Sequence, residues 1–208
     1  MKKALILISV CLLCLVPGVS GQPENGDENQ AAIDFPEVEG WIKGEVKKYS
    51  PAELGYSIGY RSNIGGIVTV YVYDKGLKGI PDGPYSNQVS TEIITAKNEI
   101  RSLLERGVYG AARFTKFQYR KLGSETGMFM VAQLDVELVR EGRTYYSEIL
   151  MTGLEGKFVK IRATRAPGIE GLENKAIFNL YEALDSFFSG KKDEFLKNRA
   201  KVSGTAIR

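Results

Sequence analysis

The stretch Met128–Thr164, MFMVAQLDVELVREGRTYYSEILMTGLEGKFVKIRAT, decides the fold. Its first part alternates apolar and polar residues, which is the period of a half-buried β-strand. Turns at Glu141-Gly142-Arg143 and Gly153–Gly156 separate this strand from two more, Tyr145–Thr152 and Lys157–Thr164. Three consecutive strands joined by short Gly-containing turns predict an antiparallel meander.

Further strands are predicted before the meander. Gly55–Arg61 and Ile67–Tyr73 flank a turn at Ser62–Gly66 and predict a hairpin. Ile67–Tyr73 is rich in β-branched and aromatic residues, and both of its faces are apolar, so we expect it in the centre of the sheet. Gly40–Lys48 predicts a short edge strand, and Ala112–Leu122 resumes the alternation that leads into the meander.

Two amphipathic helices are also predicted. The first follows the turn-forming segment Asp74–Pro84, is capped by Ser86 or Ser90, and ends at Gly107. The second ends at Gly190. Apolar residues at helical spacing are Val89, Ile93, Ala96, Ile100, Leu103 and Leu104 in the first, and Leu172, Ala176, Leu180, Ala183, Leu184 and Phe187 in the second.

These elements predict an α+β fold in the order ββαββββα. We expect an antiparallel sheet of about six strands covered by two helices, with the helices segregated to one face. The folded domain is predicted over residues 35–190, beginning near Phe35 with Trp41 as its first large apolar anchor. The polar and acidic residues 22–34 are predicted to form a flexible leader.

The first residues predict export. Lys2 and Lys3 precede the apolar run Ala4–Val16, which at about 13 residues is too short to cross roughly 30 Å of hydrocarbon as a helix. Small residues follow the run. We therefore expect residues 1–21 to be a signal peptide cleaved near Ser20 or Gly21, and the protein to be periplasmic or secreted.

Cleavage there would remove both cysteines of the chain. Cys11 and Cys14 lie inside the apolar run rather than at its end, which argues against a lipoprotein. The sequence contains no histidine. A mature chain without thiol or imidazole excludes Cys–His and Ser–His–Asp catalysis, and it excludes zinc or copper sites built on those ligands. We predict no cofactor.

The charge is balanced along the chain. Removing Lys2 and Lys3 from the formal +3 leaves about +1, and no long basic stripe predicts a nucleic-acid partner. No second apolar stretch reaches membrane-spanning length. Residues 191–208 are expected to be a solvated terminus, with weak contact to an anionic surface as the alternative. The cations of this basic tail are Lys191, Lys192, Lys197, Arg199 and Lys201.

Several oxygen-bearing and glycine-rich strings resemble ligand sites only superficially. Asp74-Lys75-Gly76 and Asp82-Gly83 lack the ligand spacing of an EF-hand, so we expect turn chemistry there and no metal. Gly65-Gly66 and Gly153–Gly156 open no helix and precede no Gly-Lys-Ser/Thr, so we expect hairpin turns rather than phosphate loops.

Carboxylates on the meander present the one candidate for acid–base catalysis, a pair about 7 Å apart on one strand face. Asp135 and Glu137 are this pair, and Glu148 lies on the neighbouring strand. The alternation places them on the polar side, and Arg140, Arg143 and Lys160 nearby predict cross-strand ion pairs instead. We therefore predict no catalytic residue, and a carboxylate-based hydrolase is the second alternative function.

The chain contains eleven tyrosines, many of them on predicted strands. β-Propensity and amphipathic core rims account for this pattern. The functional alternative is an aromatic-lined groove with Arg61 or Arg162 as its polar anchor. The predicted ligand- or partner-binding residues are Tyr60, Arg61, Tyr71, Tyr73, Asp74 and Arg162.

The order of elements resembles the PsbP-like fold, which includes the bacterial envelope protein DcrB. Leu54–Asp82, with GYSIGYR at Gly55–Arg61, also resembles uncharacterised exported proteins of Gram-negative bacteria, as does GKFVKIR at Gly156–Arg162. The resemblance covers about Gly55–Phe188. It implies fold and compartment, and it transfers no functional residue.

The preferred function is therefore that of an exported, non-enzymatic accessory protein. It would bind a protein partner of the envelope through the sheet face or through the Asp74–Pro84 loop. The first alternative is a small-ligand-binding domain with a pocket between the sheet and the helices.

Overall fold

The computed structural model describes residues 34–115, 117–165 and 175–190. Contacts divide the chain at Phe35, and the fold described below belongs to the unit that begins there. The predicted signal peptide, residues 22–33 of the predicted leader and the basic tail lie outside the described residues.

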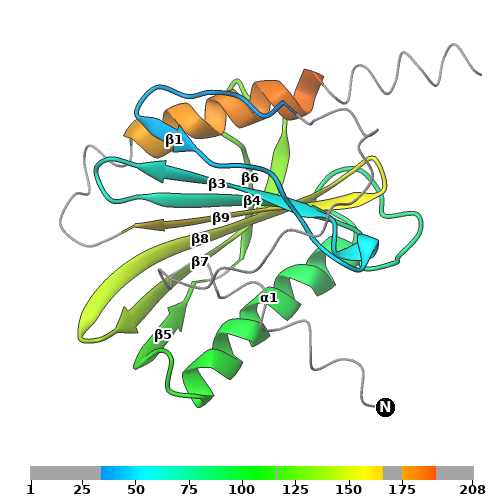
Figure 1. The fold of residues 1–208 in the computed structure, drawn as a ribbon. Helices are drawn as coiled ribbons and strands as arrows, with labels where there is room; N and C mark the ends of the chain where they lie inside the picture. The colour runs from blue at the N-terminus through cyan, green and yellow to red at the C-terminus, as the bar shows by residue number, and fades with distance from the viewer. Residues whose placement is uncertain (1–33, 116, 166–174, 191–208) are drawn as a thin grey trace, which may run out of the picture. The chain divides into compact units, whose positions relative to one another are not determined.

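The described chain forms an antiparallel sheet of nine strands (Figure 1). The strands are β1 (Trp41–Lys43), β2 (Lys47–Lys48), β3 (Tyr56–Ser62), β4 (Ile67–Tyr73), β5 (Ala111–Phe114), β6 (Gln118–Lys121), β7 (Met130–Arg140), β8 (Arg143–Leu154) and β9 (Lys157–Arg165). Their spatial order is β1-β3-β4-β9-β8-β7-β5, with β2 beside β3 and β6 beside β7. The helical elements are η2 (Ala52–Leu54), α1 (Asn87–Glu105) and a C-terminal helix over residues 175–190.

The α+β class, the antiparallel sheet and the two helices are confirmed, whereas the number of strands is wrong. At each edge of the sheet, two short strands replace one predicted strand. They are β1 and β2 at one edge, and β5 and β6 at the other. At the far edge, Phe114 pairs with Val136 and Gln118 pairs with Gln133. The edge therefore has one residue more than β7 between these pairs, which is a β-bulge.

Tight turns set the register of the meander. Glu141 and Gly142 both have positive φ, +52° and +73°, and so do Glu155 and Gly156, +51° and +74°. Positive φ at both central residues matches the right-handed twist of the strands that such a turn connects. The second turn is shorter than predicted, because Gly153 belongs to β8.

Gly153 allows the loop after β4 to pack on the sheet. Its backbone exchanges two hydrogen bonds with Gly83, at 2.9 and 3.0 Å. A Cβ at Gly153 would lie 2.0 Å from the carbonyl oxygen of Pro81, so only glycine fits. This contact holds the predicted turn segment against the end of β8 and places Tyr85 beside the sheet edge.

The first helix forms as the sequence predicts. The Ser86 hydroxyl accepts a hydrogen bond from the backbone N–H of Val89 at 3.2 Å, and Gly107 follows the helix at φ +73°. Its buried apolar side chains contact the sheet over β5, β7 and β8. They are Val89, Ile93, Ala96, Ile100 and Leu103.

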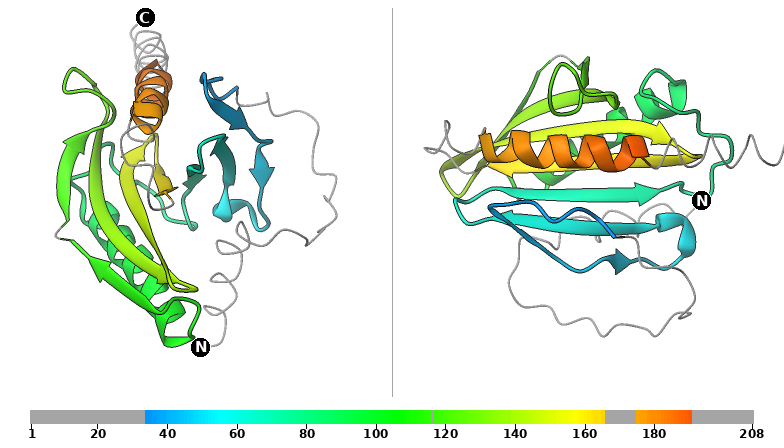
Figure 2. Two further views of the ribbon diagram at one scale, coloured as in Figure 1. Left: turned by 90° about the vertical axis from the view of Figure 1, so that its left-hand side faces the viewer. Right: turned by 90° about the horizontal axis from the view of Figure 1, so that it is seen from above.

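The two helices cover opposite faces of the sheet, whereas we predicted both on one face (Figures 1 and 2). Glu92 of α1 contacts Tyr73, and Tyr181 of the C-terminal helix contacts Glu148. The register places Tyr73 and Glu148 on opposite faces. The physical reason is that the central strands are apolar on both sides, so each face needs its own cover.

Aromatic side chains join the C-terminal helix to the sheet. Phe35, only 2% exposed, stacks on Phe187 with 4.9 Å between ring centroids. The indole N–H of Trp41 donates to the backbone carbonyl of Ala176 at 3.0 Å. Full burial of one such aromatic side chain stabilises a fold by about 1.5–3 kcal/mol, so these contacts hold the helix to its face.

Candidate functional site

The predicted site residues divide between the two faces of the sheet. Tyr71 and Tyr73 lie on the α1 face of β4, and Arg162 lies on the same face of neighbouring β9. Tyr60 lies on the other face, 1% exposed, and its hydroxyl donates to the carbonyl of Pro36 at 3.0 Å. The structure thus brings three of the predicted residues to one face and separates Tyr60 from them.

A lysine lies between the two tyrosines of the α1 face, and these three residues form the lysine–tyrosine cluster (Lys160, Tyr71 and Tyr73). Lys160 is 8% exposed. Its Nζ lies 4.9 Å from the ring centroid of Tyr71 and 5.3 Å from that of Tyr73. Both distances are within the range of cation–π attraction.

Glu92 connects α1 to this cluster. The Tyr73 hydroxyl donates to its carboxylate at 2.8 Å, and the Lys75 ammonium donates to it at 2.7 Å. Glu92 is 7% exposed, so its charge is largely desolvated and paired with one ammonium and one phenol. Because buried carboxylates are retained only when they are paired, these contacts explain an acidic residue on the buried side of α1.

Arg162 and Arg61 differ in surroundings. The Arg162 guanidinium is half-buried and donates to the Tyr109 hydroxyl at 3.4 Å. Arg61 is exposed and pairs with Ile42 of β1, near the other edge of the sheet. Of the two predicted polar anchors, Arg162 therefore shares its strand and face with Lys160.

Asp74 organises a turn at the end of β4. Its carboxylate accepts a hydrogen bond from the backbone N–H of Gly76 at 2.8 Å and pairs with Lys157 at 3.0 Å. These two interactions, the backbone bond first, lower the pKa of Asp74. Asp82 accepts in the same way from the backbone N–H of Glu155, at 2.8 Å. Both aspartates thus have the turn roles that the sequence predicts.

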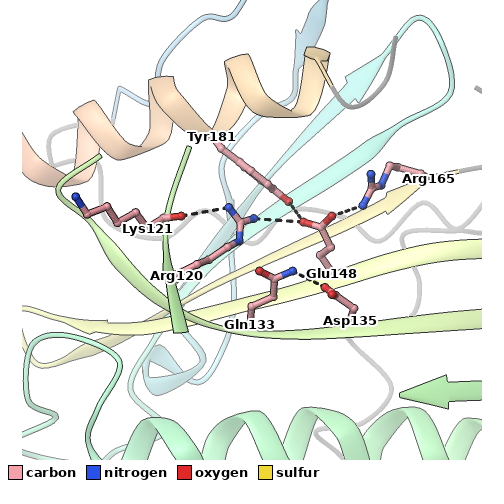
Figure 3. Close-up of polar contacts among 7 residues, drawn as sticks. All are labelled: Arg120, Lys121, Gln133, Asp135, Glu148, Arg165 and Tyr181. Atoms are coloured by element: carbon pink, nitrogen blue, oxygen red, sulfur yellow. Dashed lines mark hydrogen bonds and ion pairs between the residues drawn. The ribbon is translucent and has the colours of Figure 1, made fainter. Parts of the chain in front are cut away.

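On the opposite face, four side chains form the Glu148 cluster (Glu148, Arg120, Arg165 and Tyr181), shown in Figure 3. They come from β8, β6, β9 and the C-terminal helix. The Glu148 carboxylate accepts from the Tyr181 hydroxyl at 3.0 Å, pairs with Arg120 at 3.5 Å and pairs with Arg165. Burial, and then the Glu148 charge, raises the pKa of Tyr181 well above its usual range.

This geometry favours a structural role for Glu148. Its carboxylate receives two guanidinium groups and one phenol, so its charge is stabilised and its acceptor positions are occupied. Asp135, its neighbour across the β7–β8 pair, accepts from the Gln133 amide at 2.6 Å. Glu137 lies opposite Arg113 of β5. A catalytic acid or base requires a group that can exchange a proton with substrate, and the contacts of Glu148 do not favour that.

Ion pairs of the meander carboxylates were predicted with Arg140, Arg143 and Lys160, and this prediction is wrong for Glu148. Arg140 pairs with the adjacent Glu141 at 3.4 Å, and Lys160 lies on the other face of the sheet. The partners of Glu148 come instead from β6 and from the last residue of β9. Gln133 and Asp135 were predicted to face water, but they lie under the C-terminal helix layer, and Gln133 is 8% exposed.

Three exposed aromatic residues gather at one edge of the sheet, and we call them the edge aromatic cluster (Tyr85, Phe117 and Tyr119). Their exposed fractions are 64%, 38% and 42%. The ring centroids of Tyr85 and Tyr119 are 4.7 Å apart, and those of Phe117 and Tyr119 are 5.1 Å apart. A contiguous exposed patch of large aromatic side chains is typical of an interaction site.

Tyr119 of this cluster lies on β6, and this strand has an open side. Within the described residues, β6 is hydrogen-bonded to β7 alone. The backbone N–H of Leu122 donates to Phe129 at 2.8 Å, so alternation directs the backbone groups of Arg120 toward β7 and those of Tyr119 and Lys121 away from it. The Lys121 carbonyl accepts a hydrogen bond from the Arg120 guanidinium at 3.2 Å, so the groups that another strand could pair are those of Tyr119 and the N–H of Lys121.

Sequence reasoning missed Lys160, Glu92 and the edge aromatic cluster as parts of possible sites. A polar residue at an apolar position was the available signal for Glu92, which lies between Val89 and Ile93 on the buried stripe. Tyr85 and Tyr119 are 34 positions apart in the sequence. Their contact depends on the Gly83–Gly153 pairing, for which the sequence has no local signal.

Two classes of site are not found in the part of the chain that the structure describes. No three His, Cys, Asp or Glu side chains gather there as a possible metal site. No described helix has the length and apolar character needed to cross a membrane.

Comparison with solved structures finds several chains that match this one, and cyanobacterial PsbP is among them. The solution structure of cyanobacterial PsbP (CyanoP) from Synechocystis sp. PCC 6803 is 16% identical with a TM-score of 0.42, and the match covers 69% of this chain and 79% of that one. No family model matches the chain, and no curated protein does. At this TM-score the likeness carries no argument about activity, partner or site. The resemblance to exported Gram-negative proteins stays a prediction.

Proposed function

We propose that this protein is an exported, non-enzymatic accessory protein that binds a protein partner at the open side of β6. The observation that carries the proposal is the edge aromatic cluster. Tyr and Phe are enriched in protein interfaces because they bury a large area at low entropic cost. Tyr119 lies on β6 and Phe117 directly precedes this strand, so both adjoin backbone groups that a partner strand would pair.

The charge of this edge indicates the kind of partner. Residues 106–124 contain five basic residues and no acidic one. Arg120 is engaged by Glu148, whereas Arg113 and Lys121 form no ion pair with any described residue. An extended, acidic segment with alternate apolar side chains would therefore add to β6 by strand addition. Its backbone would supply affinity, and its apolar side chains would contact the aromatic cluster.

A labelled peptide tests the binding proposal on the full chain. We expect an alternating valine–glutamate peptide to shift and protect the amides of Tyr119 and Lys121 in NMR spectra, with affinity that falls as salt is added. The double variant Phe117→Ser, Tyr119→Ser should weaken binding at least about tenfold, because it removes two aromatic contacts. Tyr146→Ser, at an exposed tyrosine on β8, is the matched control and should bind normally.

Two results would contradict the proposal. If a valine–lysine peptide binds as tightly as the valine–glutamate peptide, the partner is not selected by negative charge. If the amide shifts are confined to other strands, the peptide does not bind at β6. The export part is tested separately, by fractionating a Gram-negative host that expresses the full chain. We expect a periplasmic or medium fraction whose N-terminus begins just after Ser20 or Gly21. An intact N-terminus in the cytoplasmic fraction would overturn it.

The alternative function, small-ligand binding, is favoured by a different observation. On the α1 face, Lys160 is a largely buried ammonium whose described contacts are two aromatic rings.

A further inference from the structure

Lys160 lies in the middle of the sheet rather than at its rim. It pairs with Tyr71 of β4 on one side and with Met151 of β8 on the other. Only 8% of the surface of this residue is exposed. No described residue forms a hydrogen bond or an ion pair with it, so the two tyrosine rings are its described partners.

Such a group has unused binding capacity. An ammonium carries three donors, and a buried charge is costly unless an opposite charge or acceptors compensate it. Ring faces attract the cation but accept none of its hydrogen bonds in the ordinary sense. The carboxylate that contacts Tyr73, Glu92, is already engaged by Lys75.

Arg162 provides a second cation on the same face. Two positions along β9 separate it from Lys160, which is about 7 Å for a strand. Its guanidinium contacts the neutral Tyr109 hydroxyl, and no described carboxylate pairs with it. Lys160 and Arg162 together thus present two positive charges that no described acidic side chain pairs.

The surroundings of Lys160 restrict the anion. The side chains next to Lys160 on this face are apolar, Met151 across the β8–β9 pair and Phe158 two positions earlier on β9. Glu92 contributes a negative charge nearby, which disfavours a doubly charged anion such as phosphate. A single carboxylate on an apolar body satisfies both conditions, since its head meets the two cations and its body meets apolar side chains.

We propose that Lys160 and Arg162 bind the carboxylate of a small apolar monocarboxylic acid between α1 and the α1 face of β9. The proposal goes beyond partner binding at β6 and does not depend on it. The site is assigned by a buried cation without an acidic partner and by a second cation on the same face of the strand.

Sodium octanoate serves as the probe for the full chain, measured by calorimetry and by NMR. We expect saturable binding that shifts amides of Lys160, Arg162 and Tyr71, and an affinity at least tenfold lower in the Lys160→Met variant. Lys157→Met, on the same strand, is the matched control and should bind octanoate like the wild type. Arg162→Met tests the second cation and should also weaken binding.

Three outcomes would overturn the proposal. They are an absence of octanoate binding by the wild type at millimolar concentration, unchanged binding by Lys160→Met, and sodium phosphate binding as tightly as octanoate. Because Lys160→Met replaces a buried charge by an apolar side chain of similar length, we expect the variant to fold, and NMR dispersion checks this. Failure of this site leaves peptide binding at β6 intact, so the two proposals are separable.

Discussion

Each face of the sheet carries a largely buried charged residue, and the partners of Glu148 differ from those of Lys160. Under the C-terminal helix, the Glu148 carboxylate meets two guanidinium groups and a phenol. Under α1, the Lys160 ammonium meets two tyrosine rings. The first arrangement is compensated within the chain and joins β6, β8, β9 and the helix. The second is not, and this difference separates a structural cluster from a candidate binding site.

Removing Glu148 should have the largest effect on this comparison. Glu148→Ala leaves two largely buried arginines without their carboxylate, and we expect the free energy of unfolding to fall by about 3–5 kcal/mol. Urea denaturation at neutral pH measures it. Glu137→Ala, at a half-buried carboxylate on the same face, is the control and should cost much less. Equal losses in the two variants would show that the Glu148 cluster has no special structural role.

Removing the phenol of Tyr181 should have the next largest effect. Tyr181→Phe deletes one hydrogen bond to a charged acceptor, worth about 1.5–3 kcal/mol. Because the pKa of Tyr181 is raised in the folded state, its contribution is fully present below the unfolded pKa of about 10 and is lost as pH rises. Denaturation at neutral pH measures the contribution of the hydrogen bond, and denaturation at alkaline pH measures its loss. If Tyr181→Phe loses as much stability at alkaline pH as the wild type does, the loss does not come from Tyr181.

Replacing Lys160 should leave the free energy of unfolding unchanged or raise it slightly. Lys160→Met removes an uncompensated charge and gives up two cation–π contacts, each worth about 0.5–2 kcal/mol. Since desolvation of the ammonium offsets these contacts, we expect the free energy of unfolding to be unchanged or higher. Thermal and urea denaturation measure this free energy, with Lys157→Met as the control variant. A loss as large as that of Glu148→Ala would mean that Lys160 is compensated after all.

The smallest loss of stability is expected at Asp74, outside both clusters. Asp74→Asn removes an accessible ion pair with Lys157, which contributes less than about 1 kcal/mol. The lowered pKa of Asp74 makes this contribution present above its unfolded pKa, about 3.9, and lost as pH falls. Variant and wild type should therefore converge in stability in acid. A constant difference across the acid range would contradict this origin.

Much of the fold could be predicted because its signals are local. Alternation identified the meander, paired turn residues marked its ends, and Ser86 with Gly107 bounded the first helix. The break between β5 and β6 was missed because a bulge adds one residue without altering the alternation on either side. The placement of the helices on opposite faces was missed because it depends on which sides of several strands are apolar together.

The candidate sites were predicted only in part. Tyr71, Tyr73 and Arg162 were singled out from composition and strand position, and they share one face, although their role as binding residues stays a prediction. Lys160 was expected in a cross-strand ion pair. Its contacts with two tyrosine rings follow from the β4–β9 register, which no single stretch of sequence contains.

The sequence by itself determined the class of fold, the absence of histidine and the export signal that we predict. These properties depend on residue type and on spacing over a few positions. Tertiary structure alone decided which charges are paired and which are not. Charge pairing depends on register and on the layers above each face, and those bring together residues, such as Arg120, Glu148 and Tyr181, that lie far apart along the chain.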